Sequence, residues 1–402
     1  APAGDFHLTD ASDIRILFTS DQTGNTSGDG TFIGLTDGGN FNIFNREATN
    51  IKMYTSGVER LNIAADGAIS TTTAGTSNTR LGVNAGDAIV SGANFNVLIG
   101  DEAGTTLSND GDNNVAVGYA AGAALTSSNN VLVGTEAGQN LAAGAQNVAI
   151  GAQALQNEDG HGENVAIGFR ALQDLNGNAQ GNNVAVGYKA GLNATTSLFS
   201  TYVGSLAGGL GVITGNNNAC FGYISGYDLT SGNANTLLGA FAGTNLTTGQ
   251  DNVAIGTSAL DVDVDGNKST AVGRNALGNQ TGTDGDMNNV AIGYNTGIGI
   301  NTGNNNTLVG TLAGDAFTTG SRNSLFGLSA GGALVGANSD NTFMGCSAGE
   351  NITSGDANTI VGRYNGNQGS LDIRELSNNI VLSDGDGNPR LLITSDGSIT
   401  NN

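Results

Sequence analysis

The acidic segment Asp261–Asn267, with the sequence DVDVDGN, is the stretch of this chain whose residue types and spacing could hold a metal ion. D-x-D-x-D-G begins an EF-hand calcium loop, in which alternating carboxylates supply oxygen ligands and the glycine permits a sharp turn. The twelfth position of that loop must be a bidentate Glu, and here it is Val272. We therefore predict an acidic turn, and we keep as a second hypothesis a loose Ca²⁺ site formed by Asp261, Asp263 and Asp265.

The two histidines, His7 and His161, are the remaining candidates for catalysis or zinc binding. A zinc site needs three or four ligands close together, and two distant histidines do not supply them. Neither histidine belongs to a Ser, Cys or Asp pattern known from hydrolases. We predict no catalytic residue, no cofactor other than the Ca²⁺ just considered, and no enzymatic activity. A polysaccharide depolymerase would need a pair of carboxylates in a groove, and the scattered aspartates leave that alternative open.

The composition is low in charge and rich in glycine. The 402 residues include 66 Gly and 2 Pro, and 12% are charged, against about 25% in an average soluble domain. The net charge of −22 argues against nucleic acid as a partner, which needs a basic face, and against an anionic membrane surface. No apolar run reaches the roughly 18 residues of a spanning helix, so we predict no membrane insertion. An acidic chain of this kind suits an extracellular or virion setting.

Most of the chain, from about Asn78 to Gly366, repeats one unit whose commonest form is N-V-A-I-G. Counting the closing glycine of each unit as its anchor, there are 17 copies spaced 16 to 20 residues apart, most often 17. The anchors are Gly82, Gly100, Gly118, Gly134, Gly151, Gly168, Gly187, Gly204, Gly222, Gly239, Gly256, Gly273, Gly293, Gly310, Gly327, Gly345 and Gly362. Positions below are counted from this anchor, so that −1 is the residue before it. Cys220 and Cys346 fall in different copies, too far apart to form a disulfide.

The unit alternates with period two and carries β-branched residues at −3 and −1, which predicts a short strand. The Gly, Asn, Ser and Thr segments between the units predict turns. A strand of this length cannot bury a face alone, so the copies must stack at about 4.8 Å per layer into a sheet roughly 80 Å long. We therefore predict an all-β fold, a parallel β-solenoid (β-roll or β-helix) of about 17 coils, with the anchor glycines at tight bends.

Position −4 is Asn in 15 of the 17 copies, and Ser200 and Ser269 are the exceptions. A turn alone would tolerate Asn, Asp and Gly in mixture. The near-exclusive use of Asn predicts instead an internal ladder, in which stacked amides hydrogen-bond from coil to coil. The clearest rungs of this ladder are Asn96, Asn114, Asn130, Asn147, Asn164, Asn183, Asn289 and Asn306.

Position −2 is apolar as well in almost every copy, with Arg80 as its single charged residue. Both faces of the strand should therefore be buried. We assign −3 and −1 to the coil interior and −2 to an interface with another copy of the chain. In the copy NNVAIG this places Val290 and Ile292 inside and turns Ala291 toward a sister chain.

The N-V-A-I-G unit resembles the head repeat of trimeric autotransporter adhesins, a left-handed parallel β-roll in which three chains pack side by side. The repeats of that family are near 14 residues long, so the loops here are longer than the family's. The resemblance implies a homotrimer, with the chains side by side or intertwined.

The two ends carry a second resemblance. RLNIAADGAIS at Arg60–Ser70 and RLLITSDGSIT at Arg390–Thr400 share the form RL-x-I-x-x-DG-x-I, which resembles segments of phage tail fibres, as does the preceding segment Gly34–Glu59. In such fibres this hairpin often precedes an intramolecular chaperone that trimerises the chain and cleaves itself off, and the chain ends about where such a cleavage would leave it. We predict an N-terminal β-rich fibre module over 1–75, the solenoid over 76–366 and a C-terminal β-hairpin module over 367–402.

These observations predict a non-enzymatic homotrimeric fibre that attaches to a host or surface, most simply a phage tail fibre. Its partners would be its own copies and a host cell-surface glycan or protein receptor. The alternatives are a bacterial surface adhesin or matrix fibre and, less favoured, a depolymerase spike. Ice binding would need a regular Thr array, and the Thr column about eight residues after the anchor is interrupted. The polar loops that differ most between copies are the places to look for recognition.

Overall fold

The computed structural model describes residues 14–18, 31–35, 41–45, 50–63, 69–70, 75, 77–108, 110–160, 162–177, 181–282 and 285–401. Every regular element in these ranges is a β-strand, so the predicted all-β class is confirmed. At the N-terminal end, β1 (Ile14–Phe18), β2 (Thr31–Leu35) and β3 (Phe41–Asn45) form one antiparallel sheet. A second antiparallel sheet consists of β4 (Ile51–Thr55), β5 (Val58–Ile63) and β6 (Ile69–Ser70).

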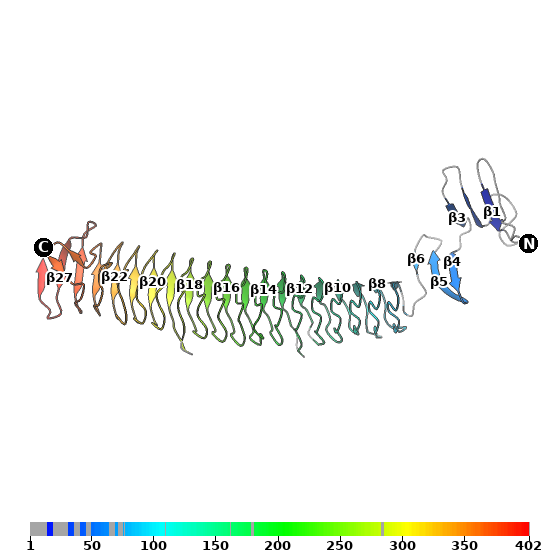
Figure 1. Ribbon diagram of the computed structural model, residues 1–402, viewed down its shortest axis with the longest axis horizontal. Coiled ribbons are helices and arrows are strands. Elements are labelled where there is room, and N and C mark those ends of the chain that lie inside the picture. The colour runs from blue at the N-terminus through cyan, green and yellow to red at the C-terminus, as the bar shows by residue number, and fades with distance from the viewer. Residues whose placement is uncertain are drawn as a thin grey trace, which may run out of the picture.

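The repeats form a parallel β-solenoid with one three-residue strand per coil, and the coils stack into the long rod seen in Figure 1. Each strand pairs in register with the next, as Val131, Leu132 and Val133 pair with Val148, Ala149 and Ile150. The strands are β7 (Thr79–Leu81), β8 (Val97–Ile99), β9 (Val115–Val117), β10 (Val131–Val133), β11 (Val148–Ile150), β12 (Val165–Ile167), β13 (Val184–Val186), β14 (Thr201–Val203), β15 (Ala219–Phe221), β16 (Thr236–Leu238), β17 (Val253–Ile255), β18 (Thr270–Val272), β19 (Val290–Ile292), β20 (Thr307–Val309), β21 (Ser324–Phe326), β22 (Thr342–Met344) and β23 (Thr359–Val361).

Each coil has two walls, which we call the strand wall (positions −3 to −1) and the return wall (positions +1 to +7). Backbone hydrogen bonds join successive coils in both walls. In the return wall Glu136 N donates to Tyr119 O of the preceding coil, and Gly138 N donates to Ala154 O of the following one. The return wall therefore has few free backbone groups, although its residues form turns rather than strands.

The parallel ladder continues beyond the predicted last coil. β26 (Ile380–Ser383) pairs in parallel with β23, so Asn379 and Ser383 take the places of the Asn and the anchor Gly. The sequence analysis missed this coil because its anchor is Ser and its spacing is 21 residues. The small hairpin β24 (Asn367–Gln368) and β25 (Leu371–Asp372) lies in the longer connection. β27 (Pro389–Ile393) and β28 (Ile399–Asn401) then add to β26 in antiparallel fashion.

The structure reverses the predicted assignment of the two strand faces. Ala291 is fully buried within its own chain, whereas Ile292 is 41% exposed and Val290 is half-buried. Position −2 thus points into the coil, and −3 and −1 point outward along the whole rod. The prediction was wrong because period-two alternation defines two faces without saying which is inside. The interior is so narrow that it takes only one residue of each three-residue strand.

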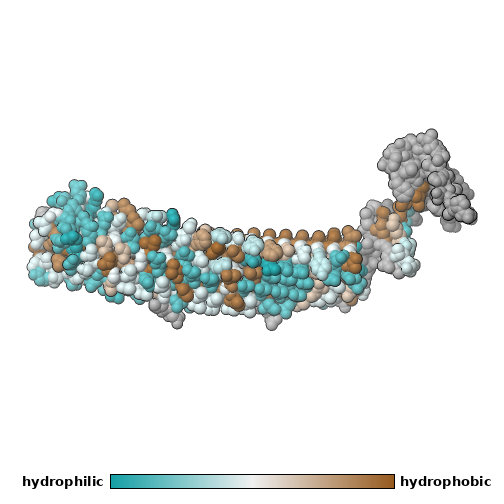
Figure 2. Space-filling view, viewed as in Figure 1, coloured by the Kyte–Doolittle hydropathy of each residue, from teal (hydrophilic) through white to brown (hydrophobic). Residues whose placement is uncertain are grey.

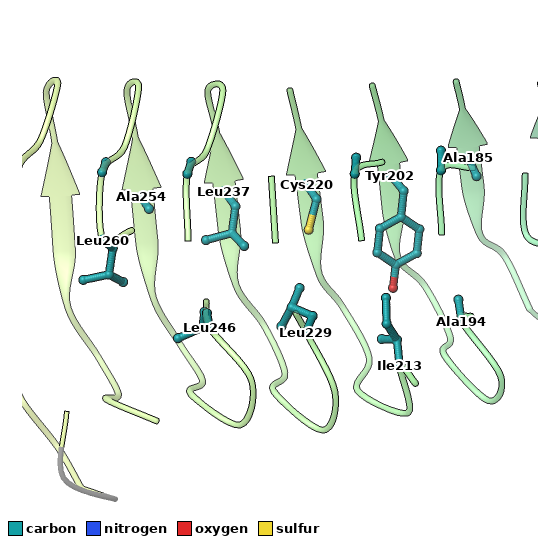
Figure 3. Close-up of a cluster of buried hydrophobic side chains, with 14 of the residues drawn as sticks. Ala185, Ala194, Tyr202, Ile213, Cys220, Leu229, Leu237, Leu246, Ala254 and Leu260 are labelled. Atoms are coloured by element: carbon teal, nitrogen blue, oxygen red, sulfur yellow. The ribbon is translucent and has the colours of Figure 1, made fainter. Parts of the chain in front are cut away.

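The core is a column of side chains packed between the two walls. Strand residues at −2 meet residues of the return wall at +7, as Cys220 and Leu237 meet Leu229 and Leu246 in Figure 3. Where Tyr202 extends across the coil, Ala194 leaves space beside it. The interior is therefore filled by volume matching between neighbouring coils rather than by one fixed residue at each position.

Candidate functional site

The repeated columns predicted to be structural are structural. The anchors Gly118, Gly134, Gly151, Gly168, Gly187, Gly256, Gly293 and Gly310 have φ between +130° and +140°. A Cβ at Gly118 would stand 2.4 Å from Gly134 O of the next coil. Both the backbone angle and this close approach require glycine, so the anchors are bends of the chain and not a ligand cradle.

The asparagine ladder is present and runs inside the solenoid, where its members are buried. Asn114 N donates to Asn96 Oδ1 at 2.8 Å, and Asn130 N donates to Asn114 Oδ1 at 2.8 Å. The same pattern joins Asn147, Asn164, Asn183, Ser200, and then Asn289, Asn306, Asn323, Asn341, Asn358 and Asn379. The side-chain nitrogen often donates to a backbone carbonyl at the far end of its own coil, as Asn306 Nδ2 donates to Gly320 O at 2.9 Å. Each such amide makes its hydrogen bonds within the protein.

Additional buried polar groups accompany both serine exceptions of the ladder. Beside Ser200, the hydroxyl of Ser197 lies 3.0 Å from Ser200 Oγ and 3.0 Å from Tyr202 Oη. Beside Ser269, Gln280 Nε2 donates to Ser269 Oγ at 3.1 Å and to Asp263 Oδ2 at 2.5 Å. Sequence reasoning missed Ser197 and Gln280. Ser197 lies three residues before a −4 position that lacks Asn, and Gln280 is a polar residue at +7, which is apolar in most copies.

The candidate Ca²⁺ ligands do not converge. Asp263 is fully buried inside the coil, whereas Asp261 and Asp265 are half-exposed. The Asp263 carboxylate is already occupied by Gln280 Nε2 and by the backbone N of Gly266, at 3.1 Å. Burial raises the pKa of this carboxyl, and both hydrogen bonds oppose the rise. Among the described residues no group of three or more His, Cys, Asp or Glu side chains is placed to hold a metal ion.

The other side chains with reactive groups are two histidines and two cysteines. His7 and His161 lie outside the residues that the structure describes. Both cysteines are unpaired, Cys220 inside the core and Cys346 at the surface. Burial raises the pKa of the Cys220 thiol to about 12, which keeps it protonated and unreactive.

A continuous apolar surface covers the strand wall instead. Exposed side chains at −1 recur from one end of the solenoid to the other, and Figure 2 shows a row of hydrophobic atoms along the upper edge of its N-terminal half. They include Leu81, Ile150, Ile167, Phe221, Leu238, Ile292, Met344 and Val361. Aromatic side chains at +1 widen this surface in several coils, and Phe169 stacks on Tyr188 with ring centroids 5.7 Å apart.

Contacts within the chain cover part of the surface of the aromatic side chains at +1. Arg170 lies 5.0 Å from the Phe169 ring centroid, and Lys189 lies 5.2 Å from that of Tyr188. Even so, Tyr188 remains 49% exposed. Monomeric proteins rarely expose apolar patches larger than about 300–600 Å², and the exposed side chains at −1 recur along the whole rod.

Comparison of the chain with protein-family models, with curated proteins and with solved structures finds no match in any of the three. The part of the chain that the structure describes contains no apolar helix of membrane-spanning length.

Proposed function

We propose that the protein is a structural fibre made of parallel copies of this chain, in the simplest case a homotrimer, that attaches a virion or a cell to a surface. The exposed apolar strand wall carries this proposal. A second copy of the same wall offers an equally long apolar surface with the same coil spacing. Burying residues such as Ile150 and Ile167 between copies would remove this surface from water.

The two edges of the strand wall support a parallel, in-register arrangement. Positions −5 and +2 lie at opposite ends of each strand, so the −5 edge of one chain would meet the +2 edge of its neighbour in a ring. At one coil these positions hold Glu163 and Arg170, and at the next but one they hold Phe199 and Leu206. In none of the 17 repeats do they carry charges of the same sign. Coils of equal number placed side by side would therefore pair Glu163 with Arg170 and would bring no like charges together at these edges.

The resemblance to autotransporter heads and tail fibres supports the number three and the attachment role. A phage tail fibre agrees best with the flanking RL-x-I-x-x-DG-x-I segments, and a bacterial adhesin is the second candidate. Labelling with an antibody against this chain separates the two, because it would mark virion tails in the first case and cell surfaces in the second. Turnover of capsule or lipopolysaccharide by the purified protein would favour a depolymerase instead.

Light scattering tests the assembly. We expect a native mass near three times the 40.0 kDa of the chain. Glutamate at both Ile150 and Ile167 should dissociate the fibre, because these side chains are on the strand wall and take no part in the coil interior. A control with glutamate at Asn193 and Asn245, on the return wall, adds the same charge and should leave the mass unchanged. A wild-type mass of 40.0 kDa would overturn the proposal.

A further inference from the structure

The return wall is hollowed at two places, and both hollows are lined from the same positions of the repeat. The first has a volume of about 430 Å³ and the second about 210 Å³. All lining residues of both lie at +2, +5 or +6 after an anchor. The lining residues on which the argument depends are Asp87, Glu102, Ala123, Ala124, Gln139 and Asn140 in the first hollow and Gly278 in the second.

Small residues at +5 and +6 open these hollows. In the coils from Gly134 to Gly168, position +5 is Gln and its side chains bond along the rod, as Gln173 Nε2 donates to Gln156 Oε1 at 2.7 Å. The first hollow lies beside Ala123 and Ala124, in the coil just before this run of Gln, and the second lies beside Gly278. Each hollow therefore lies beside a +5 position with a short side chain.

The chemistry of the first hollow suits hydroxyl groups. Gln139 uses its Oε1 to accept from Gln156 Nε2 at 3.1 Å, and within the described residues its Nε2 has no partner. Asn140 donates to Asn157 Oδ1 at 3.2 Å, and the Glu102 side chain has no bonded partner among the described residues. Each of these groups can exchange hydrogen bonds with a sugar hydroxyl.

A peptide strand is less suited to this surface, because the backbone of the return wall is already bonded between coils. Ala124 N donates to Gln139 O at 2.9 Å, and Gly122 N donates to Ala137 O at 2.9 Å. Strand addition needs free backbone groups at an edge. None of the described lining residues is Lys or Arg, so an anionic chain would meet the carboxylates of Asp87 and Glu102 unpaired.

We propose that the return wall is the track on which this fibre binds an extended polysaccharide that is uncharged or carries amino groups, seated first in the hollow over Ala123 and Ala124. The proposal rests on the attachment function proposed above and gives it a site and a ligand class. The lining residues at +5 and +6 are on the wall away from the apolar strand face, so assembly through the strand wall leaves them open, whereas Glu102 at +2 lies toward the edge that would meet a neighbouring chain. Parallel copies would present several equivalent tracks, which raises the avidity for a repeating ligand.

The test fills the hollow with residues that the chain itself uses at these positions. The double substitution Ala123→Gln and Ala124→Asn reproduces the Gln-Asn pairs at 139–140 and 156–157, so it should fold and assemble like the wild type. Affinity electrophoresis through gels containing dextran, galactomannan, glycol chitosan or alginate measures the binding. We expect at least one of the first three polysaccharides to retard the wild-type fibre and alginate not to retard it. The filled variant should bind about tenfold more weakly, which is equivalent to the loss of one or two hydrogen bonds.

The control Asn245→Gln lies at +6 outside both hollows and should bind as the wild type does. The proposal is overturned if no neutral or amino polysaccharide retards the fibre, if the filled variant binds as tightly as the wild type, or if alginate binds best. Loss of cell attachment after protease treatment but not after periodate oxidation of the cells would also overturn it, in favour of a protein receptor. Light scattering on the same samples reports the assembly independently, so failure of the track and failure of the fibre are distinguishable.

Discussion

Two kinds of coil fill the same interior in opposite ways. In the coils around Leu155, Leu172, Leu260 and Leu277, the residue at +4 is Leu and both flanking −2 residues are Ala. In every other coil +4 is Gly, and at least one flanking −2 residue is larger than Ala. The backbone is the same in both kinds, with φ of +53° at Leu155 and +55° at Gly138. The difference shows that neighbouring coils share one volume, which either wall can fill.

A variant in which both walls place a large side chain in the same part of the core should show the largest loss of stability. In Gly208→Leu, the new Cβ would stand 2.5 Å from Tyr202 Cδ1 and 2.7 Å from Cε1, inside the fully buried core. Overpacking and a left-handed Leu together should cost about 4 kcal/mol of unfolding free energy. Chemical denaturation followed by circular dichroism measures this cost, and hydrogen exchange should place it in the coils next to Tyr202. Wild-type stability in this variant would contradict shared filling of the core.

A leucine removed from the strand wall and replaced by one on the return wall should restore part of the lost unfolding free energy. Leu132→Ala leaves a cavity and should cost about 3 kcal/mol. Adding Gly138→Leu then places a leucine between Ala149 and the alanine introduced at position 132, the same surroundings that Leu155 has between Ala149 and Ala166. We expect the double variant to recover about 1–2 kcal/mol of unfolding free energy, less the strain of a left-handed Leu.

Gly138→Leu alone serves as the control for this exchange. Its Cβ would stand 2.8 Å from Leu132 Cδ2, so the single substitution should destabilise the protein. A double variant no more stable than Leu132→Ala would show that the two positions do not share one volume.

The sequence predicted the parts of this fold that depend on a unique residue type. The positive φ of the 17 anchor bends favours Gly, and the ladder uses Asn in 15 of 17 copies because its side chain supplies both an acceptor and a donor, so these columns were visible. The inside and outside of the strand were not, because the core positions share no residue. Ala116, Leu132, Tyr202 and Cys220 are alternatives whose sizes make sense only beside their neighbours. The hollows on the return wall depend on small residues among long ones and could not be located without the coil register.

The smallest change in stability should come from a coil in which the core residue at +7 is charged. Position +7 is Leu in many coils, but it is Asp263 in the coil of Leu260 and Gln280 in that of Leu277. Burial raises the pKa of Asp263, so the folded state binds a proton more tightly than the unfolded state, whose Asp titrates near pH 3.9. Stability contributed by this proton is complete below that pH and is lost as the pH rises through the raised folded pKa.

Asp263→Asn removes this loss while keeping an oxygen that can accept from Gln280 Nε2. We expect the variant to be more stable than the wild type by about 1 kcal/mol at neutral pH, and the difference to vanish at about pH 4. Asp265 is the charged neighbour that acts on this carboxyl in the same direction, and Asp265→Asn should give a smaller change of the same sign. Thermal unfolding across this pH range measures both variants. A wild type whose stability relative to Asp263→Asn improves as the pH rises would show that the hydrogen bonds from Gln280 and Gly266 stabilise the Asp263 carboxylate as an ion.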